Sequence, residues 1–387
     1  MHILVLPSWY STKSNDLSGS FFREQALALS GLGHKVGIIY PYVRGLDKLF
    51  DGSRGVSLEN DFGVATYRYN AVSWIPYTPV AREFFLRKAG ITLFKKYINK
   101  YGKPDIIHAH SLLHAGVVAE KIYNKFNIPY IVTEHRSVYK TLGVRPGLKK
   151  TLIKSAKHSF ANFAVSEAYR DFLNSYFDNA VSWKYLPNMI SPIFEIEQNL
   201  RSKNNQDFVF AHVSNLTQNK QTQNVIKAFA EEFDENENVK VFIGGEGAEL
   251  KNLKRIAKSL NVQNRVTFLG KLKRSDVVAL FSRVHASMVT SEFETFSMVT
   301  VEALASGIPV ISSRCGGPES IIQTQDGIFY DTNDLEQLKY AMRFMYQNYN
   351  MFDAKKIRRS AVRRFGSKVI TKKLTDIYQQ VLTDNNR

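Results

Sequence analysis

Short apolar segments that alternate with amphipathic ones are the feature that most constrains the fold of this chain. The apolar segments have the length of strands, and the amphipathic segments have the length and periodicity of helices. The alternation runs from His2 to about Tyr176, breaks near Pro187 and resumes at Phe208. Such a pattern is typical of parallel sheets with helices on both faces. The sequence therefore predicts an α/β fold made of two doubly wound domains.

The expected strands and helices follow from this pattern. The strands are His2–Leu6, Lys35–Tyr40, Val64–Tyr69, Pro104–Ile107 with His108 at its tip, Tyr130–Thr133, Phe160–Val165, Phe208–Val213, Val239–Gly244, Arg265–Leu269, Ala286–Thr290, Val310–Ile311 and Gly327–Tyr330. The main helices are Phe21–Leu32, Val80–Tyr101, Leu112–Phe126, Gln221–Phe233, Ala248–Leu260, Ser275–Phe281, Ser297–Ser306, Leu335–Tyr349 and Phe365–Leu382. Ligands of such sheets bind at the carboxyl ends of the strands, so we expect functional residues in the loops that follow them.

The length also predicts two domains. At 387 residues the chain exceeds the roughly 250–300 residues at which one core stops growing. Pro187–Pro192 breaks the alternation, and the polar run Glu195–Gln206 follows, so we place the linker there. We expect an N-terminal domain at 1–190, a second domain at 191–364, and a C-terminal helix at 365–387 that crosses back to the first.

The charge of the chain is strongly positive. Its 52 Lys and Arg residues against 35 Asp and Glu residues give a formal net charge of +17. Such a charge fits nucleic acid, an anionic membrane surface or anionic small substrates. No recognition-helix, zinc-finger or RNA-binding motif is present, so we expect no nucleic-acid partner. Residues 81–103 alternate basic and apolar side chains, which predicts an amphipathic helix suited to peripheral membrane contact. A surface helix with a solvated basic face is an equally open interpretation.

Cysteine usage and the N-terminus indicate a compartment. Cys315 is the single cysteine, which excludes an internal disulfide and fits a reducing cytoplasm. The N-terminal apolar run is short and lacks a preceding basic region, so it predicts a first strand and not a signal peptide. No run of about 18 apolar residues predicts a transmembrane span. We expect a cytoplasmic protein, peripheral at most to the inner face of a membrane.

The stretch Ser291–Glu319, SEFETFSMVTVEALASGIPVISSRCGGPE, carries two spaced carboxylates. Glu294 precedes the helix predicted at Ser297–Ser306, and Glu302 lies inside it; Gly307 then ends the helix. With a rise of about 1.5 Å per residue the two carboxylates lie about 10 Å apart. That separation is too wide for the carboxylate pair of a retaining glycoside hydrolase. It suits an extended polar ligand whose phosphates lie at the N-terminus of the helix.

The order and spacing of these segments resemble the retaining glycosyltransferase family 4, the glycosyl transferases group 1. The match is most specific in Glu294-x7-Glu302 within ETFSMVTVEALASGIPV and in the GGPE that follows. The family shows E-x-F-G-x4-E-A-x-A-x-G-x-P-V and then G-G-x-x-E. The resemblance implies a GT-B fold, in which two Rossmann-like domains face each other across a cleft. It assigns the acceptor to the first domain and the nucleotide-sugar donor to the second.

The resemblance implies roles for the glutamate run. In the family the first glutamate contacts hydroxyls of the donor sugar and the second contacts the ribose, so the expected ligands here are Glu294 and Glu302. The residues expected to lie along the donor are Phe296, Ser297, Met298 and Val299. Each carboxylate can accept two hydroxyl hydrogen bonds, and bonds to a charged acceptor are the stronger kind.

A lysine after the first strand of the second half is the expected phosphate ligand. The family shows G-R-L-x3-K-G there, whereas this chain shows Ser214–Gln221, SNLTQNKQ. Lys220 matches the diphosphate lysine, although a surface lysine at a helix start remains the alternative. Asn215 replaces the family arginine, and an amide cannot neutralise charge. Either another cation compensates, with Arg136 and Arg314 as candidates, or the phosphate is held more weakly.

Two residues of the first half match family positions, and two further histidines are candidates for the acceptor side. Gly19, in SGSFFREQ, matches the glycine loop that approaches the donor phosphate and acceptor, or is simply a flexible helix start. His135, after a strand, resembles the histidine that faces the donor sugar. His108 and His110 either border the acceptor or satisfy backbone groups; both interpretations stay open.

Two other chemistries are weaker interpretations. Gly244–Gly247 follows a strand, but the full G-x-G-x-x-G and the acidic residue of a dinucleotide site are absent, so we interpret it as a tight turn. Imidazole is a usual zinc ligand, yet no H-E-x-x-H or comparable spacing exists, and we expect no metal. The residues that raise the question are His108, His110, His114, Glu134 and His135.

The sequence thus predicts a metal-independent, retaining hexosyltransferase without a cofactor. Its co-substrate would be a UDP- or GDP-sugar, and its acceptor a saccharide or a lipid-linked molecule. The resemblance implies a role in bacterial polysaccharide, capsule or glycolipid synthesis. His135 and Glu294 would steady the reacting sugar. The alternatives are a catalytically weak nucleotide-sugar-binding protein and an epimerase or phosphorylase on the same fold.

Overall fold

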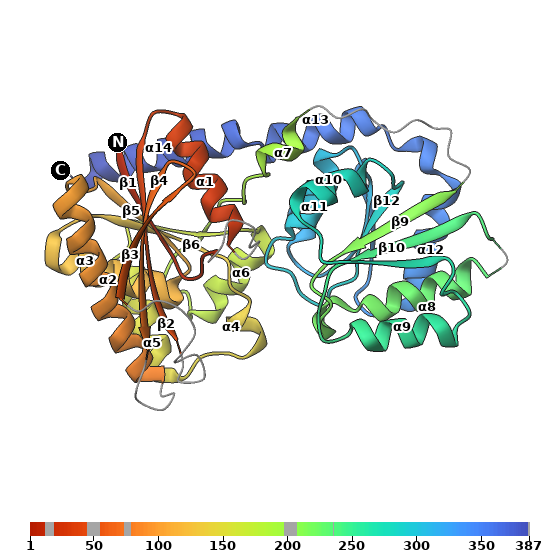
Figure 1. The fold of residues 1–387 in the computed structure, drawn as a ribbon, viewed down its shortest axis with the longest axis horizontal. Coiled ribbons are helices and arrows are strands. Elements are labelled where there is room, and N and C mark those ends of the chain that lie inside the picture. The colour runs from red at the N-terminus through yellow and green to blue at the C-terminus, as the bar shows by residue number, and fades with distance from the viewer. Residues whose placement is uncertain (12–18, 45–54, 73–78, 197–206, 235, 386–387) are drawn as a thin grey trace. The chain divides into compact units, whose positions relative to one another are not determined.

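The computed structural model describes residues 1–11, 19–44, 55–72, 79–196, 207–234 and 236–385. The chain divides into two compact units (Figure 1). The first unit holds Met1–Val165, Tyr169–Pro187 and Ile370–Arg387; the second holds Ser166–Ala168 and Asn188–Val369. Most of the predicted linker, residues 197–206, lies outside the described residues.

The first unit is built on an eight-stranded sheet with the order β3-β4-β2-β1-β5-β6-β7-β8. Its strands are β1 (His2–Pro7), β2 (Lys35–Arg44), β3 (Gly55–Asp61), β4 (Val64–Val72), β5 (Ile106–His110), β6 (Tyr130–Glu134), β7 (Ala161–Ala164) and β8 (Lys184–Tyr185). All pairs are parallel except the hairpin of β3 and β4. The chain leaves β1 toward β2 and later returns beside β1 as β5, so the sheet reverses its order there. In doubly wound sheets that reversal marks the ligand-binding crevice.

Helices complete the first unit. They are α1 (Ser20–Gly31), α2 (Pro79–Tyr101), a π-helical turn η2 (Leu112–Gly116), α3 (Val117–Phe126), α4 (Val138–Thr141), α5 (Pro146–Lys157), α6 (Glu167–Tyr176, which begins in the second unit) and most of α14 (Ser367–Asn385). Figure 1 shows α14 beside the N-terminal elements. Its Tyr378 hydroxyl lies 2.7 Å from His108 Nδ1, and its Thr375 hydroxyl lies 3.0 Å from His34 Nε2.

The second unit is built on a six-stranded, all-parallel sheet with the order β11-β10-β9-β12-β13-β14. Its strands are β9 (Phe208–Val213), β10 (Val239–Gly244), β11 (Val266–Gly270), β12 (Ala286–Val289), β13 (Val310–Ser313) and β14 (Gly327–Tyr330). Its order reverses between β9 and β12. The loops after these two strands therefore lie side by side at the carboxyl edge of the sheet.

Helices cover this second sheet. They are α7 (Pro192–Glu195), η3 (Gln218–Lys220), α8 (Thr222–Glu232), α9 (Leu250–Ser259), α10 (Arg274–Phe281), α11 (Met298–Ala305), η4 (Pro318–Ser320), α12 (Leu335–Gln347), η5 (Tyr349–Met351) and α13 (Ala354–Phe365). Helix α8 packs against both α9 and α12 (Figure 1). The core between helices and sheet includes the buried Phe210, Phe229 and Met342. Asp334 caps α12 by accepting from Gln337 N at 2.9 Å, a contact of about 1 kcal/mol.

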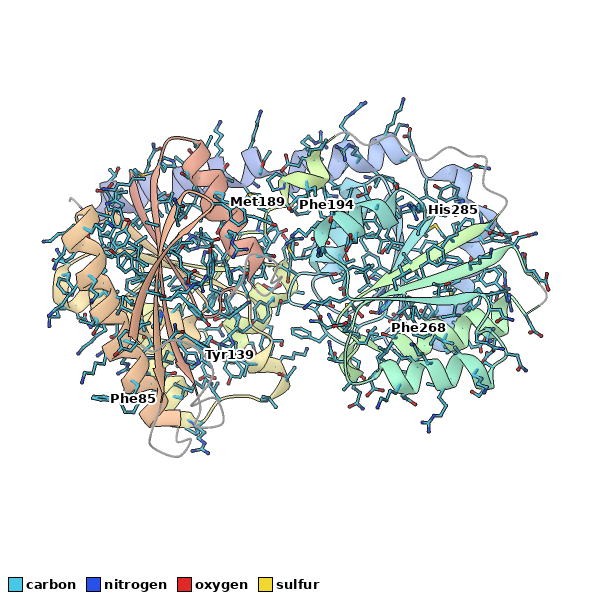
Figure 2. All side chains as sticks on the ribbon, viewed as in Figure 1. Phe85, Tyr139, Met189, Phe194, Phe268 and His285 are labelled. Atoms are coloured by element: carbon cyan, nitrogen blue, oxygen red, sulfur yellow. The ribbon has the colours of Figure 1, made fainter. Side chains whose placement is uncertain are left out.

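Local chemistry also fixes the edges of the second unit. His285 Nδ1 accepts from Val209 N at 2.8 Å, and its ring stacks on Phe208 with centroids 4.3 Å apart (His285 is labelled in Figure 2). Phe194 of α7, also labelled, is fully buried and packs near Phe281 of α10. These contacts hold the start of the second unit on its own helices.

Several expected elements differ from the structure. The predicted helix Leu112–Phe126 begins as the π-helical turn η2 and becomes α-helical at Val117. The predicted helix at Phe365 is wrong at its start, since Phe365 ends α13 and α14 begins at Ser367. His108 lies inside β5 and not at its tip, because the strand continues to His110. The strand β3 and the helices α5 and α13 were not expected.

Candidate functional site

Lys220 and Glu294 meet where the second sheet reverses its order. Lys220 follows β9 and Glu294 follows β12, and the Lys220 ammonium contacts Glu294 Oε1. The Ser291 hydroxyl donates to the same carboxylate oxygen at 2.7 Å. The Lys220 side chain is 22% exposed and the Glu294 side chain 15%, so a ligand in this loop cluster can reach both. The sequence predicted both residues as donor ligands, and the structure brings them together.

The loop that carries Lys220 is fixed from below by His212. The ring of His212, in β9, lies 2.9 Å from the Ser214 hydroxyl, 3.1 Å from the Thr222 hydroxyl and 3.1 Å from Met288 O. Burial, with a smaller effect of Lys220, lowers the pKa of His212 to about 4. The imidazole is therefore neutral at pH 7, and its two ring nitrogens link the loop to β12 by hydrogen bonds.

Two residues in this site adopt a left-handed backbone where the family pattern has glycine. Gln221, directly after Lys220, has φ 48°, and Ser297, at the start of α11, has φ 86°. Side chains disfavour this region, and such conformations concentrate at ligand sites. The Ser297 hydroxyl lies 2.8 Å from the Thr300 hydroxyl. The left-handed backbone is kept at both positions although neither residue is glycine. The fold therefore requires this conformation, which explains the glycines of the family pattern.

The start of α11 presents backbone more than side chain. Phe296 is 2% exposed, and its ring packs 6.1 Å from that of Phe365. Its carbonyl approaches Gly317 so closely that a Cβ on Gly317 would lie 2.3 Å from it. Met298 and Val299 form the first turn of α11. Phe296 thus anchors the segment, while the half-buried Met298 and Val299 stay partly accessible after it.

Glu302 is held by an arginine that the sequence analysis did not select. Arg274, the first residue of α10, contacts Glu302 Oε1 through Nη1. The Glu302 side chain is 8% exposed, and the other residues of α11 around it are apolar or small. A buried carboxylate is costly unless it is paired. The local sequence Lys271–Arg274, KLKR, is typical of a solvated basic surface. Only the contact of Arg274 with Glu302, 28 residues away, marks Arg274 as part of the site.

Asn215 and its two candidate substitutes stand on three different segments of the chain. Asn215 is exposed, and its carbonyl accepts from Thr217 N at 2.8 Å. Arg314 lies 3.5 Å from Asp331 and over the Phe329 ring. Arg136, the other candidate, belongs to the first unit.

The Gly244–Gly247 loop is architectural, as the sequence predicts. Gly245 has φ 137°, and a Cβ there would lie 1.8 Å from Ser214 O. A Cβ on Gly247 would lie 2.2 Å from Leu216 O. The absence of side chains lets the loop after β10 pack directly on the loop after β9. These glycines therefore shape the edge of the sheet that holds Lys220.

In the first unit, His110 and His135 meet at the corresponding edge. His110 Nδ1 lies 3.1 Å from His135 Nε2, and both rings contact Phe22, with centroids 4.5 and 5.1 Å away. Burial lowers the pKa of His135 to about 3 and that of His110 well below 6.5. Both imidazoles are therefore neutral at pH 7, and one donates its N–H to the other. Gly19, with φ 71°, lets α1 begin against Trp9, because a Cβ would lie 3.0 Å from Trp9 O.

Glu134 organises the loop that carries His135. Its carboxylate accepts hydrogen bonds from the backbone N–H groups of Leu112, His135 and Arg136, at 2.8–2.9 Å, and from the Tyr139 hydroxyl at 3.0 Å. Tyr139 is labelled in Figure 2. Burial raises the pKa of Glu134, while the backbone hydrogen bonds act in the opposite direction. We interpret Glu134 as a positioning carboxylate, since four donors converge on it.

His108 lies in the interior of the first unit. It is fully buried, with Nδ1 at the Tyr378 hydroxyl and Nε2 2.8 Å from the Thr133 hydroxyl. Both ring nitrogens thus have internal partners, which favours the structural interpretation of His108 over contact with an acceptor. His114 is paired with Glu83 of α2. Over the residues that the structure describes, no group of three or more His, Cys, Asp or Glu side chains could hold a metal ion.

Two family models match the chain along most of its length. Residues 18–192 match the model described as Glycosyltransferase Family 4, and residues 194–363 match the model described as Glycosyl transferases group 1. The chain belongs to glycosyltransferase family 4. The resemblance inferred from the glutamate run is thereby confirmed.

Known proteins similar to this family 4 glycosyltransferase cover between 73% and 99% of it. N-acetyl-alpha-D-glucosaminyl L-malate synthase of Bacillus anthracis is 26% identical over 302 residues, which are 73% of this chain and 76% of that protein. Sucrose-phosphate synthase from Thermosynechococcus elongatus matches with a TM-score of 0.79 and 18% identity, over 99% of this chain and 100% of that one. Anabaena Alr3699/HepE in complex with UDP matches with a TM-score of 0.75 and 17% identity, over 98% and 100%. The predicted GT-B fold is confirmed.

Proposed function

We propose that this glycosyltransferase moves a sugar from a nucleoside diphosphate to an acceptor hydroxyl with retention at the anomeric carbon. The observation that carries the proposal is the edge of the second sheet. There the two carboxylates of the E-x7-E run each meet a cation, Lys220 at Glu294 and Arg274 at Glu302. Carboxylates suit sugar hydroxyls and cations suit phosphates, so one nucleotide-sugar satisfies both kinds of group. The solved relative Alr3699/HepE in complex with UDP supports the choice of nucleotide.

In this proposal each end of the donor has its own ligand. Glu294 accepts hydrogen bonds from hydroxyls of the transferred sugar, and Glu302 accepts from the ribose. Lys220 neutralises charge on the diphosphate, and its ion pair with Glu294 keeps both groups poised next to each other. The backbone of Ser297–Val299 lies along the donor at the start of α11, with a contribution from the helix dipole of about 0.3–1 kcal/mol.

The chemical step exchanges one bond to the anomeric carbon for another on the same face. The bond from C1 to the diphosphate oxygen breaks, and the bond from C1 to the acceptor oxygen forms. The acceptor proton passes to the leaving phosphate oxygen, so atoms and charge balance without a protein base. Lys220 stabilises the charge that develops on the leaving group, a role that needs no divalent metal in this proposal. The neutral His135 steadies the sugar by hydrogen bonding.

A binding screen followed by a transfer assay tests this function. UDP-, GDP-, ADP- and TDP-sugars should be compared by thermal shift, with and without EDTA. We expect one nucleotide class to raise Tm equally in both buffers, and Glu302→Ala to remove that shift. Glu237→Ala, at an exposed position before β10, is the matched control and should keep it. Loss of binding in EDTA would refute the metal-free proposal.

Transfer of a radiolabelled sugar separates the enzyme from its main alternative. An enzyme should release nucleoside diphosphate and transfer the labelled sugar to an acceptor. Without an acceptor it should transfer the labelled sugar to water. Asn215 and Gln221 depart from the family pattern, and binding without any turnover would favour the nucleotide-sugar-binding alternative. A saccharide or lipid-linked acceptor is the proposal for the partner substrate.

Helix α2 supports peripheral contact with an anionic membrane, which would suit a lipid-linked acceptor. Phe84 is 63% exposed, and Lys88, Lys95 and Asn99 continue the same helical stripe as exposed residues. Figure 2 shows the neighbouring Phe85 projecting outward from α2. A basic stripe with one exposed aromatic residue suits the surface of anionic lipids. In the described part of the chain, every helix is too short or too polar to cross a membrane.

Vesicle sedimentation tests the membrane contact. The protein should bind vesicles of phosphatidylglycerol more strongly than vesicles of phosphatidylcholine, and less strongly as salt is raised. Phe84→Ser with Lys88→Glu should reduce binding several-fold, at about 1 kcal/mol per removed basic contact. Lys258→Glu, on α9 of the second unit, is the control. Equal vesicle binding by the wild-type protein and by the Phe84→Ser, Lys88→Glu variant would refute the role of α2.

A further inference from the structure

The loops after β1 and β5 meet where the first sheet reverses its strand order. The Ser8 hydroxyl, after β1, accepts hydrogen bonds from the backbone N–H groups of His114 and Ala115, after β5, each at 3.0 Å. Ser8 N donates to His110 O at 3.1 Å. These bonds fix both loops at the point where doubly wound sheets bind ligands. Polar groups that reach this point are therefore candidates for ligand contact.

Helix α2 carries a carboxylate to these loops. Glu83 Oε1 contacts His114 Nδ1, and the two side chains are 10% and 12% exposed. Glu83 Oε2 is buried, and within the described residues no hydrogen-bond donor meets it. The same holds for Nε of Arg87, one helical turn further along α2. A buried polar atom without a partner is costly, so both atoms indicate a polar partner that the chain itself does not supply.

The spacing of Glu83 and Arg87 places them on one side of α2, with Cβ atoms about 5–6 Å apart. A hydroxyl can donate to a carboxylate oxygen and accept from a guanidinium N–H. An ionised carboxylate or phosphate oxygen has no proton to donate, so it would leave Glu83 Oε2 unpaired and bring like charge beside it. The two unpaired atoms therefore favour a neutral ligand with hydroxyl groups over an anion.

Two partly exposed aromatic rings border the same loops. Trp9 directly follows Ser8, and its ring centroid lies 6.2 Å from that of Phe21, at the start of α1. Both rings lie near His135, with centroids 6.3 and 5.3 Å from its ring. We call Trp9 and Phe21 the aromatic wall. A sugar ring presents C–H groups on its faces, which suit the negative face of an aromatic ring, and hydroxyls at its edge. Aromatic surface with a few polar groups is typical of small-molecule sites.

We propose that this edge of the first unit binds a neutral saccharide as the acceptor, with Glu83 and Arg87 on its hydroxyls and the aromatic wall against its ring. His114 holds the Glu83 carboxylate through Oε1, so Oε2 remains for an acceptor hydroxyl. The acceptor then lies beside His135, which the proposed function assigns to the transferred sugar. This inference rests on the proposed function, because it names the acceptor class of the same enzyme.

Ligand-observed saturation-transfer NMR measures this binding without knowledge of the donor. The neutral probes are the methyl α-glycosides of glucose, galactose, mannose and N-acetylglucosamine. The anionic counterparts are methyl α-glucuronide and glucose 6-phosphate. We expect the wild-type protein to bind at least one neutral glycoside, about 10-fold more tightly than either anion. A wild-type protein that binds no neutral glycoside, or that binds the anions equally well, overturns the inference.

Variants then assign the binding to the two parts of the site. Glu83→Gln should weaken the bound glycoside about 10- to 100-fold, the range for losing a hydrogen bond to a charged group. Trp9→Ala should weaken it about 2- to 10-fold through the lost ring contact. Asp178→Asn, which neutralises a 72% exposed carboxylate in the same unit, is the control and should keep the wild-type affinity. Unchanged affinity in Glu83→Gln overturns the inference, whatever the result for Trp9→Ala.

Nucleotide binding separates this inference from the proposed function. Calorimetry with UDP and GDP should give the wild-type affinity in both variants, because the proposed ligands of the nucleotide lie in the second unit. If nucleotides bind and glycosides do not, only this inference fails. If glycosides bind and no nucleotide does, the proposed function fails, and the acceptor role of the saccharide site fails with it.

The fold of each variant is checked by circular dichroism and by its Tm without ligand. A native spectrum with weakened glycoside binding and unchanged nucleotide binding is the expected result. A lowered Tm with unchanged glycoside affinity would show that Glu83 and His114 form a purely structural pair, which overturns the inference.

Discussion

The two sheets reverse their strand order in the same way but carry different chemistry at their carboxyl edges. In the second unit the loops after β9 and β12 bring charged groups together, Lys220 with Glu294. In the first unit two neutral imidazoles meet one strand away from the reversal between β1 and β5: His110 ends β5 and His135 follows β6. One topology thus supports a partly exposed ion pair in one unit and a buried pair of uncharged imidazoles in the other.

The difference follows from burial. The side chains of Glu294 and Lys220 keep partial contact with solvent, so a ligand can reach both members of the ion pair. His110 is 1% exposed and His135 9%, and burial lowers the pKa of each. A neutral imidazole cannot attract phosphate but can exchange hydrogen bonds with a neutral sugar. The strand order thus decides which loops meet, while the burial of these loops decides whether the groups that meet there are charged or neutral.

Removal of the Lys220 charge should have the largest effect. We expect Lys220→Met to lower kcat/KM by about 10²–10³, the loss typical of one preorganised group that stabilises transition-state charge. Tm should change little, because partly exposed ion pairs contribute about 0–1 kcal/mol. Lys240→Met, which removes an exposed pair with Asp207 in the same unit, is the control and should keep full activity. Retained activity in Lys220→Met would contradict the contrast between the two edges.

Removal of the buried Glu134 charge should destabilise the first unit. We expect Glu134→Gln to lower the free energy of unfolding by about 1.5–3 kcal/mol. The reason is that the NH2 group of the glutamine would face backbone N–H groups that now donate hydrogen bonds to a carboxylate oxygen. Urea denaturation gives the free energy, and hydrogen exchange at the Leu112 and His135 amides locates the loss. Asp171→Asn, with a side chain 64% exposed, is the control. Unchanged exchange at those amides would show that Glu134 does not order the His135 loop.

Acidification should weaken the first unit more than the second. The pKa of His108 and that of His135 are each lowered by burial to about 3, so between pH 3 and about 6.5 the unfolded chain binds more protons than the folded one. Stability is therefore fully present above about pH 6.5 and falls as the pH is lowered, by about 1.4 kcal/mol per pH unit for each proton.

Hydrogen exchange at pH 7.5 and 5.5, corrected for intrinsic rates, measures this loss in each unit. In the second unit His212, with a pKa of about 4, contributes in the same direction. His135→Asn should reduce the pH slope of the first unit by about one proton. A slope that stays unchanged in this variant would indicate that His135 is not buried and neutral in solution.

The contact between Arg136 and Trp9 should give the smallest effect. The Arg136 guanidinium lies 5.6 Å from the Trp9 ring centroid, at the neutral edge of the first unit. Such a contact contributes about 0.5–1 kcal/mol. A double-mutant cycle of Trp9→Leu and Arg136→Gln by urea denaturation should give a coupling of that size. A coupling of zero would show that the contact between Arg136 and Trp9 does not stabilise the first unit.

The sequence predicted those elements whose burial shows in local composition. β9, β10 and β14 match their expected bounds. β9 reads as a short apolar run because it is a central parallel strand that is buried along most of its length. The sequence missed β3, where GVSLEND has no apolar run and pairing with β4 decides the strand. It also missed α13, AKKIRRSAVRRF, whose charged surface hides the buried stripe of Ile357, Ala361 and Phe365.

The candidate site was predictable where its residues share one local motif. Glu294, Glu302 and Lys220 stand in spaced patterns that a reader can match in the sequence. Arg274 could not be selected, because KLKR is typical of any solvated helix start. Gln221 and Ser297 replace glycines of the pattern, and only the backbone angles show that the conformation is kept.

The sequence by itself determined the two series of strands and helices, the family, and the residue types that we propose to hold a nucleotide-sugar. Periodicity and spacing are local properties, so they survive in the linear chain. The tertiary structure decided which charges face each other: Lys220 meets Glu294 across 74 residues because β9 and β12 are neighbours in the sheet. It also decided which histidines lose their charge, because burial depends on every element packed around them. Partner choice and desolvation are non-local, and the fold alone supplies them.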